Sequence, residues 1–469
     1  MAETYSRAGS VSLKKETTAN TAVIPNVFIP INDEDIATAF DYAPSIPISG
    51  NRSVNQRAIK NTIKAPTGSV NLNIEPKTFG HFLNGISGGV TSGSYVDISS
   101  VSAPFTVGET VTGGTSSETA IVLFAGDDFF ILGTVSGVLT DGETLTGGTS
   151  SSTAVLGTYD ATVYGHASRV PADNTVTYSL QLNYSDRAFR YYGVRFHGLD
   201  SMAQSDNIMT GGCQVMAQGI LRHAKVTAAV TSGAGSKSIP VDQTGGFVAT
   251  DSIKVYRPST GVFLDFLSAA VKTHTIGTVD GANLELDITN LETSLAVGDL
   301  IVLAPQTPTY TIVDEYAWVG CSQMSLGVDK DSLANFDAQD FTMVLTSEFE
   351  ERHAARGTNF ENRFPSDLLQ KGLTGSGTFT LHNENEDFFR SYRVNANQSV
   401  KLVTESGEIG STGVNYKLEV LYPKVQFDNY DTNLSADDVV NEEIPFTSFY
   451  DATAGFEAQV LLVNDIASY

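Results

Sequence analysis

Two stretches of the chain decide its fold: Thr67–Ile74, with the sequence TGSVNLNI, and Thr374–Leu381, with the sequence TGSGTFTL. Both begin with Thr-Gly-Ser and continue as an alternation of polar and apolar residues, which predicts a strand with one buried face. Each is followed by two aromatic residues three positions apart, a spacing that places both rings on one face of a helix. The aromatic pairs are Phe79 with Phe82 and Phe389 with Tyr392. The same order of turn, strand and helix start indicates one fold used twice in a single chain, and such chains commonly form rings.

The alternation also predicts which side chains of these two strands are buried. We expect Val70, Leu72 and Ile74 to face a core, and Phe379 and Leu381 to do the same. Their polar neighbours should then lie on the opposite face. An ordinary solvated sheet face explains those polar neighbours as well as any functional surface does.

The composition is that of a globular, β-rich protein. The chain has 469 residues, 41% of them hydrophobic, and 42 glycines, so its length predicts about two to four domains. No apolar run approaches the ~20 residues that cross a bilayer, and the first residues lack the apolar stretch of a signal peptide. With only two cysteines, disulfides cannot be the main support of the fold. These features predict a soluble protein that folds in a reducing cytoplasm, with no membrane partner.

The net charge of −25 argues against binding of a nucleic-acid backbone, which requires basic side chains to neutralise phosphates. One interpretation of this charge is solubility, and the other is a surface that repels DNA. The charge count alone does not separate the two.

A second, closer repeat lies between residues 95 and 163. Gly108–Ser117, with the sequence GETVTGGTSS, returns as GETLTGGTSS at Gly142–Ser151, and each copy continues into a short apolar alternation. Gly-Gly favours a tight turn between strands, so each copy is predicted to be a hairpin-like unit. Two copies are too few for a solenoid, which favours a small closed β domain inserted in a loop.

These patterns predict an all-β chain with two tandem β-sandwich modules, each with a short flanking helix, and two small inserted β domains. One early strand at residues 10–14 should precede an extended arm, and Asn383 should begin the second helix, which runs through Tyr392. The predicted segments are 1–94 (N-terminal arm and first part of module 1), 95–163 (insert with the repeat), 164–226 (rest of module 1), 227–308 (second insert) and 309–469 (module 2).

The residues that usually carry catalysis are not arranged for it. No pair of histidines has metal-ligand spacing, neither Cys213 nor Cys321 lies in a CxxC motif, and no Gly-Lys-Ser/Thr follows the Gly-Gly pairs. The acidic pairs Asp127-Asp128 and Asp437-Asp438 lack the spacing of a calcium loop, so we expect solvated turns there. The acidic pair Glu350-Glu351 could in principle serve a glycosidase, but nothing in the sequence places it across a sugar. The sequence therefore predicts no enzyme, no catalytic residue, no metal and no cofactor.

Several short motifs, in their order along the chain, resemble the tail tube (major tail) proteins of long-tailed bacteriophages. They cover both large modules and skip the two inserts. The motifs are Ser12–Thr18, Pro25–Pro30, Thr67–Pro76 and Phe79–Leu83 in the first module, and Gly375–Thr380, Tyr422–Val425 and Gly455–Val460 in the second.

The resemblance implies a structural virion protein without catalytic residues. Its subunit would be a β-sandwich whose inner sheet joins those of neighbours into a barrel, and stacked rings would form a tube that conducts double-stranded DNA into the host without binding it specifically. The implied partners are further copies of the chain and the tape measure, tail-tip and tail terminator proteins. The implied location is the virion tail, assembled in the cytoplasm of the host bacterium. Two modules per chain predict a trimeric ring with pseudo-sixfold symmetry, with a hexamer of chains as the alternative.

Polar residues on the alternating strands are the candidates for the lumen wall of such a tube. A further alternating segment, Thr175–Leu182, extends the argument from the two Thr-Gly-Ser strands to a third. The candidate lumen-facing residues are Asn71, Asn73, Glu75, Ser179, Gln181, Asn183, Thr378 and Thr380.

The competing hypothesis is a β-rich tail-tip or surface protein that binds host glycans through its inserted repeats. Sugar binding usually requires exposed aromatic rings for stacking. The only rings between the two copies of the repeat are Phe124, Phe129 and Phe130.

Overall fold

The computed structural model of the chain is almost entirely β. It describes residues 9–45, 57–170, 175–204, 207–264, 273–291, 293–311, 315–316, 322–336, 338–354, 363–382, 390, 393–394, 396–429, 431–433 and 441–469. The helix α1 spans Phe79–Ile86. Up to residue 221 the strands are β1 (Ser10–Lys15), β2 (Val27–Ile29), β3 (Asp33–Glu34), β4 (Phe40–Ser45), β5 (Arg57–Ile63), β6 (Thr67–Asn73), β7 (Thr91–Ser99), β8 (Thr110–Gly113), β9 (Thr119–Ala125), β10 (Phe129–Gly133), β11 (Thr144–Gly147), β12 (Thr153–Val170), β13 (Tyr178–Asn183), β14 (Ala188–Gln204), β15 (Thr210–Met216) and β16 (Gly219–Leu221). The later strands are β17 (Ala224–Lys225), β18 (Gly233–Pro240), β19 (Ser252–Arg257), β20 (Val262–Phe263), β21 (His274–Asp280), β22 (Glu285–Leu291), β23 (Leu300–Leu303), β24 (Ser322–Gly327), β25 (Ala334–Phe336), β26 (Asp340–Arg352), β27 (Asp367–His382), β28 (Gln398–Glu408), β29 (Asn415–Phe427), β30 (Asp431–Asn433), β31 (Asn441–Ser448) and β32 (Ala458–Asn464).

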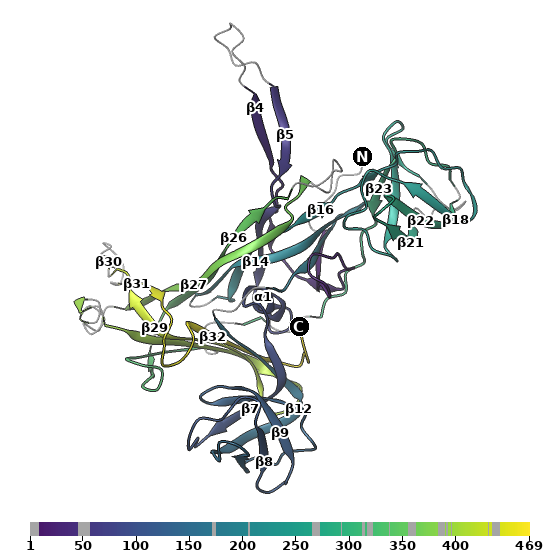
Figure 1. Ribbon diagram of the computed structural model, residues 1–469. Helices are drawn as coiled ribbons and strands as arrows, with labels where there is room; N and C mark the ends of the chain where they lie inside the picture. The colour runs from purple at the N-terminus through teal and green to yellow at the C-terminus, as the bar shows by residue number, and fades with distance from the viewer. Residues whose placement is uncertain are drawn as a thin grey trace.

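The centre of the molecule is an antiparallel sheet built from residues far apart in the sequence. Its strand order is β3–β6–β15–β14–β26–β27–β31–β30. The first four strands precede residue 217 and the last four follow residue 339, so the pairing of β14 with β26 joins the two parts of the chain. Figure 1 shows these strands crossing the middle of the molecule. We call this the central sheet.

The buried positions predicted from the two Thr-Gly-Ser strands are confirmed. Val70, Leu72, Ile74, Phe379 and Leu381 are each at most 2% exposed and belong to one core. The predicted strands are β6 and the second part of β27, so a period of two identified both correctly.

The glycine of each Thr-Gly-Ser unit leaves room for a neighbouring segment. A Cβ on Gly68 would lie 2.5 Å from the Cα of Ile36, and a Cβ on Gly375 would lie 2.5 Å from the Oγ of Ser448. Such approaches are too close for any side chain at these two positions.

Helix α1 follows β6, as the aromatic spacing predicted. Phe79 and Phe82 are both buried, and the Phe82 ring lies 5.2 Å from that of Phe196 on β14. The second aromatic pair, Phe389 and Tyr392, and the predicted helix start at Asn383 lie outside the described residues.

A second layer of strands covers the core side of the central sheet. In the first part of the chain the order is β1–β13–β14–β16, and in the second part it is β24–β28–β29–β32. Apolar side chains from β1, β13, β28 and β29 share one core with those of β6 and β27. Strand β12 pairs with β32, so the first part of the chain also extends the second layer of the second part.

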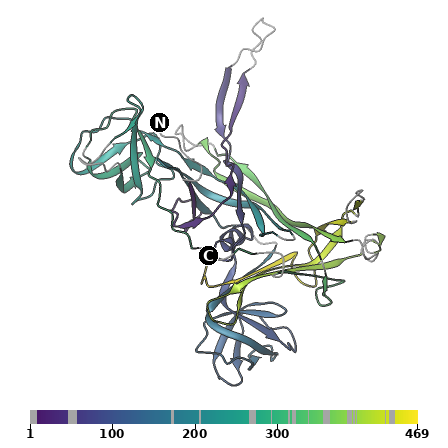
Figure 2. The same cartoon turned by 180° about the vertical axis from the view of Figure 1, so that it is seen from behind.

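The strand predicted at residues 10–14 is present as β1. The arm that follows is the antiparallel pair β4–β5, which projects from the body of the molecule in both views instead of wrapping around it (Figures 1 and 2).

The repeat between residues 95 and 163 forms the hairpins that the Gly-Gly turns predicted. Strand β8 pairs with β9, β11 pairs with β12, and β8 also pairs with β11. This unit has its own apolar core, which includes Val111, Val122 and Leu145. The paired strands β7 and β12 connect this unit to the second layer, and the unit lies below that layer in Figure 1.

Each copy of the repeat completes the other through its glutamate. The carboxylate of Glu143 accepts hydrogen bonds from the backbone N–H of Thr115 and Ser116, both at 2.9 Å, and from the Ser116 hydroxyl at 2.8 Å. In return, Glu109 accepts a hydrogen bond from the backbone N–H of Ser150 at 2.9 Å and one from its hydroxyl at 2.8 Å. Burial raises the pKa of both carboxyls, but the hydrogen bonds together bring it below the ordinary value. Each glutamate therefore binds the Thr-Ser turn of the other copy and links the two copies.

The acidic pair in the turn before β10 is ion-paired rather than only solvated. Asp127 lies 3.0 Å from the Nζ of Lys330, and Asp128 lies 3.0 Å from the Nζ of Lys401 on β28. The Lys401 ammonium also contacts the buried Glu419, 3.1 Å away. These pairs connect the unit that contains the repeat with the second part of the chain. The other acidic pair, Asp437-Asp438, lies outside the described residues.

Residues 224–303 form a second unit with its own core, which includes Ile239, Ile253 and Ile288. The Asp280-Gly281 turn, a sequence that favours hairpins, joins β21 to β22. Strand β18 was not predicted because its sequence, GAGSKSIP, has few apolar residues and two glycines.

The hydrogen bonds between each glutamate and the turn of the other copy predict that Glu143→Gln destabilises the unit that contains the repeat. Glutamine keeps one carbonyl oxygen but loses the charge, so we expect a loss of about 1–3 kcal/mol in local opening free energy. Amide hydrogen exchange at Thr115 and Ser116 measures this directly. The control is Glu118→Gln, whose carboxylate accepts one exposed hydrogen bond from Ser136. If the amides of Thr115 and Ser116 were equally protected in both variants, Glu143 would not stabilise this turn.

Candidate functional site

The central sheet has one face on the core and one face that is polar. We define the polar face as the side chains that point away from the core on β3, β6, β15, on β14 from Gly198, on β26 up to Thr346, on β27 from Thr374, and on β31. Its acidic members with described side chains are Asp33, Asp200, Asp340 and Glu443. Asp35, just after β3, and Asp428, just after β29, join them through hydrogen bonds from the Ser69 and Thr447 hydroxyls of this face. Its Ser, Thr, Asn and Gln members with described side chains are Thr67, Ser69, Asn71, Asn73, Thr210, Gln214, Thr342, Thr346, Thr374, Ser376, Thr378, Thr380 and Thr447. No Lys or Arg lies among the described positions of this face, so it is a polar surface of negative charge.

Four of the sequence candidates lie together on this face. Asn71 and Asn73 on β6, and Thr378 and Thr380 on β27, are all half-buried and alternate with core residues. The strand register links them through one row that runs from Asn73 through Thr210, residue 202 and Thr342 to Thr378. The structure therefore brings the candidates from both Thr-Gly-Ser strands onto one continuous surface.

Hydrogen bonds hold the polar face at its first edge. The Asn71 amide donates to Asp33, and the Ser69 hydroxyl donates to Asp35 at 3.0 Å. The amide of Asn32 donates to the Oδ1 of Asn73 at 3.0 Å. These contacts fix the carboxylates on the polar face instead of leaving them free in solvent.

The prediction that Ser179, Gln181 and Asn183 face outward is wrong. All three are buried, with exposures of 0%, 1% and 3%. Strand β13 lies between β1 and β14, and its polar side is covered by the second unit and by the segment near Pro25. Here the polar alternation marks a buried interface between parts of the chain and not a solvated face.

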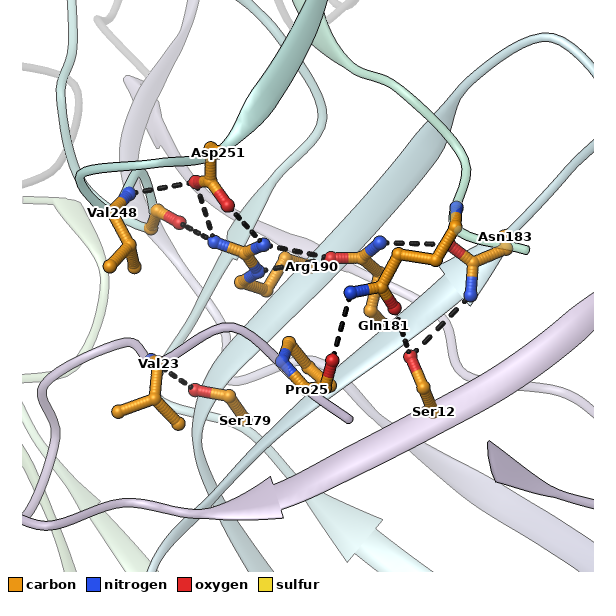
Figure 3. A network of polar contacts seen from close by, with 11 residues as sticks. Ser12, Val23, Pro25, Ser179, Gln181, Asn183, Arg190, Val248 and Asp251 are labelled. Carbon is orange, nitrogen blue, oxygen red and sulfur yellow. Dashed lines mark hydrogen bonds and ion pairs between the residues drawn. The ribbon is translucent and has the colours of Figure 1, made fainter. Parts of the chain in front are cut away.

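A buried ion pair lies at the centre of that interface. The Nη2 of Arg190 lies 2.7 Å from the Oδ1 of Asp251, and the two side chains are 1% and 2% exposed. The guanidinium also donates to the Oε1 of Gln181 at 2.9 Å, and the Gln181 amide donates to Asn183 at 2.8 Å. Figure 3 shows this network, which continues to Ser12. The sequence contains no signal for this pair, because residues 190 and 251 meet only in the folded chain.

The prediction for Glu75 is also wrong, because its side chain is 1% exposed. The carboxylate accepts hydrogen bonds from the backbone N–H of Lys77, at 2.9 Å, and of Thr78. It lies just before α1, where free N–H groups and the helix dipole favour a negative charge. Glu75 therefore stabilises the start of the helix.

The described residues contain no cluster that could bind a metal ion. No group of three or more His, Cys, Asp or Glu side chains among them could hold a metal ion. Cys213 is buried in the core, and burial raises the pKa of its thiol well above the ordinary value. No helix in the described part of the chain is long and apolar enough to span a membrane.

The aromatic rings near the repeats are not available for stacking on sugars. Phe124, Phe129 and Phe130 are at most 8% exposed. The rings of Phe124 and Phe129 stack on each other with centroids 5.8 Å apart, and the Arg169 guanidinium lies over Phe124. These rings are packed against apolar side chains of the unit that contains the repeat.

No protein-family model matches the chain, and a search of curated proteins found no significant match.

The buried ion pair predicts that Asp251→Asn weakens the attachment of the second unit to β13 and β14. The change leaves the Arg190 charge buried without a counter-charge, which typically costs about 3–5 kcal/mol. Limited proteolysis and hydrogen exchange of residues 224–303 measure the effect. The matched control is Lys371→Met, which breaks the exposed pair with Glu350 and should cost at most about 1 kcal/mol. If both changes altered proteolysis and hydrogen exchange of residues 224–303 to the same extent, the buried pair would not stabilise the attachment of the second unit.

Proposed function

We propose that the chain is the subunit of a bacteriophage tail tube, which stacks as rings into a hollow conduit for genome delivery. The observation that carries this proposal is the central sheet, with one face on the core, one acidic polar face, and no strand paired to the outer edge of β3 or β30 among the described strands. A sheet with unpaired edges accepts further strands from another chain. Closure into a barrel would remove both edges at once.

The order of strand pairing supports two copies of one module. In the first part of the chain the order is β3–β6–β15–β14 in the central sheet and β1–β13–β14–β16 in the second layer. In the second part it is β26–β27–β31–β30 and β24–β28–β29–β32. Each of these strands has a counterpart with equivalent neighbours in the other part, with the long strand β14 matched by β29 and β30 together, because both β29 and β30 pair with β31. The two Thr-Gly-Ser strands occupy equivalent places. On this basis the two inserts are additions to the first module and to the connection between the modules.

Ring closure would repeat the contact between β14 and β26. The end strand β30 of one copy would pair with β3 of the next, a head-to-tail contact that closes when the rotation between copies fits. Three copies would give about 24 strands, which at ~4.8 Å spacing and ~40° tilt form a barrel roughly 50 Å across at the backbone. Six copies would double that width, which favours the trimer with pseudo-sixfold symmetry.

The polar face would line the lumen of this tube. Asn71, Asn73, Thr378 and Thr380 would then contact water and passing DNA, while carboxylates such as Asp200 repel the phosphates. Binding of DNA is driven by basic side chains, which release counterions from the phosphates. A wall of acidic and uncharged polar side chains, without basic ones, would therefore let a duplex pass without binding it. The role assigns the chain to the virion tail, assembled in the bacterial cytoplasm, with tape measure, tail-tip and terminator proteins as partners.

The arm β4–β5 would contact a neighbouring copy. A two-stranded hairpin alone in water is marginally stable, and this one projects beyond the core (Figure 2). Stacked rings would supply the surface that it lacks in the isolated chain.

The test is electron microscopy of the concentrated protein together with native mass spectrometry. We expect hollow rings or tubes whose rings contain three chains and show six similar inner lobes. Rings of six chains would preserve the tube function and contradict the two-module symmetry. Monomers that persist at high concentration, and after addition of phage tail tips as seeds, would contradict the proposed function.

A further inference from the structure

The two open edges of the central sheet differ in charge from the contact that joins the two parts of the chain. This inference rests on the proposed function and concerns how the copies meet. We call the pairing of β14 with β26 the internal seam, which runs from Gly198 opposite Thr346 to residue 204 opposite Asp340. We call the contact between β3 of one copy and the β29–β30 edge of another the outer seam.

The internal repeat shows which residues on the first edge correspond to β26. Asn71 of β6 and Thr378 of β27 hold the same place in the two Thr-Gly-Ser strands. Asn71 pairs with Asp33, and Thr378 pairs with Thr342. Asp33 therefore corresponds to Thr342, and by the same spacing Asp35 corresponds to Val344.

The second edge is assigned in the same way. Asp200 of β14 lies opposite Gly212, which lies opposite Asn71. In the second part, the backbone N–H of Asp428 donates to the carbonyl of Pro445, which lies opposite Thr378. Asp428 therefore corresponds to Asp200.

We propose that copies of the chain pair in the register of the internal seam, with Asp428 of one copy directly opposite Asp35 of the next. In the internal seam the same position places Asp200 opposite the apolar Val344. The Asp428 carboxylate accepts a hydrogen bond from the Thr447 hydroxyl at 2.7 Å, and the Asp35 carboxylate accepts one from Ser69, so both lie on the polar face.

This arrangement makes ring closure depend on ionic strength. Cβ atoms of residues directly opposite in an antiparallel pair are ~5 Å apart, and like charges at that distance destabilise the pairing. The carboxylate of Asp33, two residues along the same edge, adds to the repulsion. Dissolved salt screens such exposed charges, so closure should require screening that the internal seam does not. Charges on an open edge also keep free subunits from pairing at random.

The register is tested by disulfide cross-linking in a Cys321→Ser background, with the buried Cys213 retained. Asp35→Cys combined with Asp428→Cys should form covalent dimers and closed trimers under mild oxidation. The control combines Asp33→Cys with Asp428→Cys, which removes as much charge but sets the thiols two residues apart. At ~7–8 Å between Cβ atoms that pair is too distant for a disulfide. Preferential cross-linking of the control, or of neither pair while rings form, would overturn the proposed register.

The charge effect is tested by following ring formation against NaCl concentration. Asp35→Asn should form rings at lower salt than the unaltered chain, whereas Asp200→Asn, in the internal seam, should not. An equal salt requirement for the unaltered chain and Asp35→Asn would overturn the acidic outer seam. If the unaltered chain forms no rings at any salt concentration, the proposed function itself fails. If rings form in another register, only this inference fails.

Discussion

The pairing of β14 with β26 is the contact on which the arrangement of the whole chain depends. It joins a strand that ends at residue 204 to one that begins at Asp340, and it makes one sheet from two sets of four strands. Because backbone hydrogen bonds carry this contact, the two parts share a single core and a single polar face. The same contact leaves β3 and β30 at the ends of the sheet.

The two faces of the central sheet have different roles, because one stabilises the fold and the other forms a polar surface. Apolar residues such as Leu72 and Phe379 are buried on one face, where they provide most of the favourable free energy of folding. The other face carries mainly acidic and uncharged polar side chains at its described positions. A surface with no basic residue at its described positions, next to two edges that can accept strands, is the combination from which the tube proposal follows.

The sequence predicted the parts of the fold that depend on local pattern. Strict alternation identified β6 and β27 and their buried faces, and Gly-Gly turns identified the hairpins of the repeat. The same alternation misled for Gln181, because pattern shows that two faces of a strand differ but not what covers each face. Contacts between distant residues, such as Arg190 with Asp251, have no local signal at all.

The reciprocal glutamates lie between these cases. The repeat in the sequence showed that Glu109 and Glu143 hold equivalent positions. Only the structure shows that each one binds the turn of the other copy. The four polar-face candidates on β6 and β27 were correctly placed opposite the core, and their place in a lumen remains part of the proposal.

The most direct test of the central claim is a cryo-electron microscopy reconstruction of the assembled protein at a resolution that separates strands. The account predicts a continuous barrel in which β30 of each chain pairs with β3 of the next and the side chains of Asn71 and Thr378 line the channel. A reconstruction in which the central sheets of neighbouring chains do not pair, or in which the polar face lies on the outside, would contradict it.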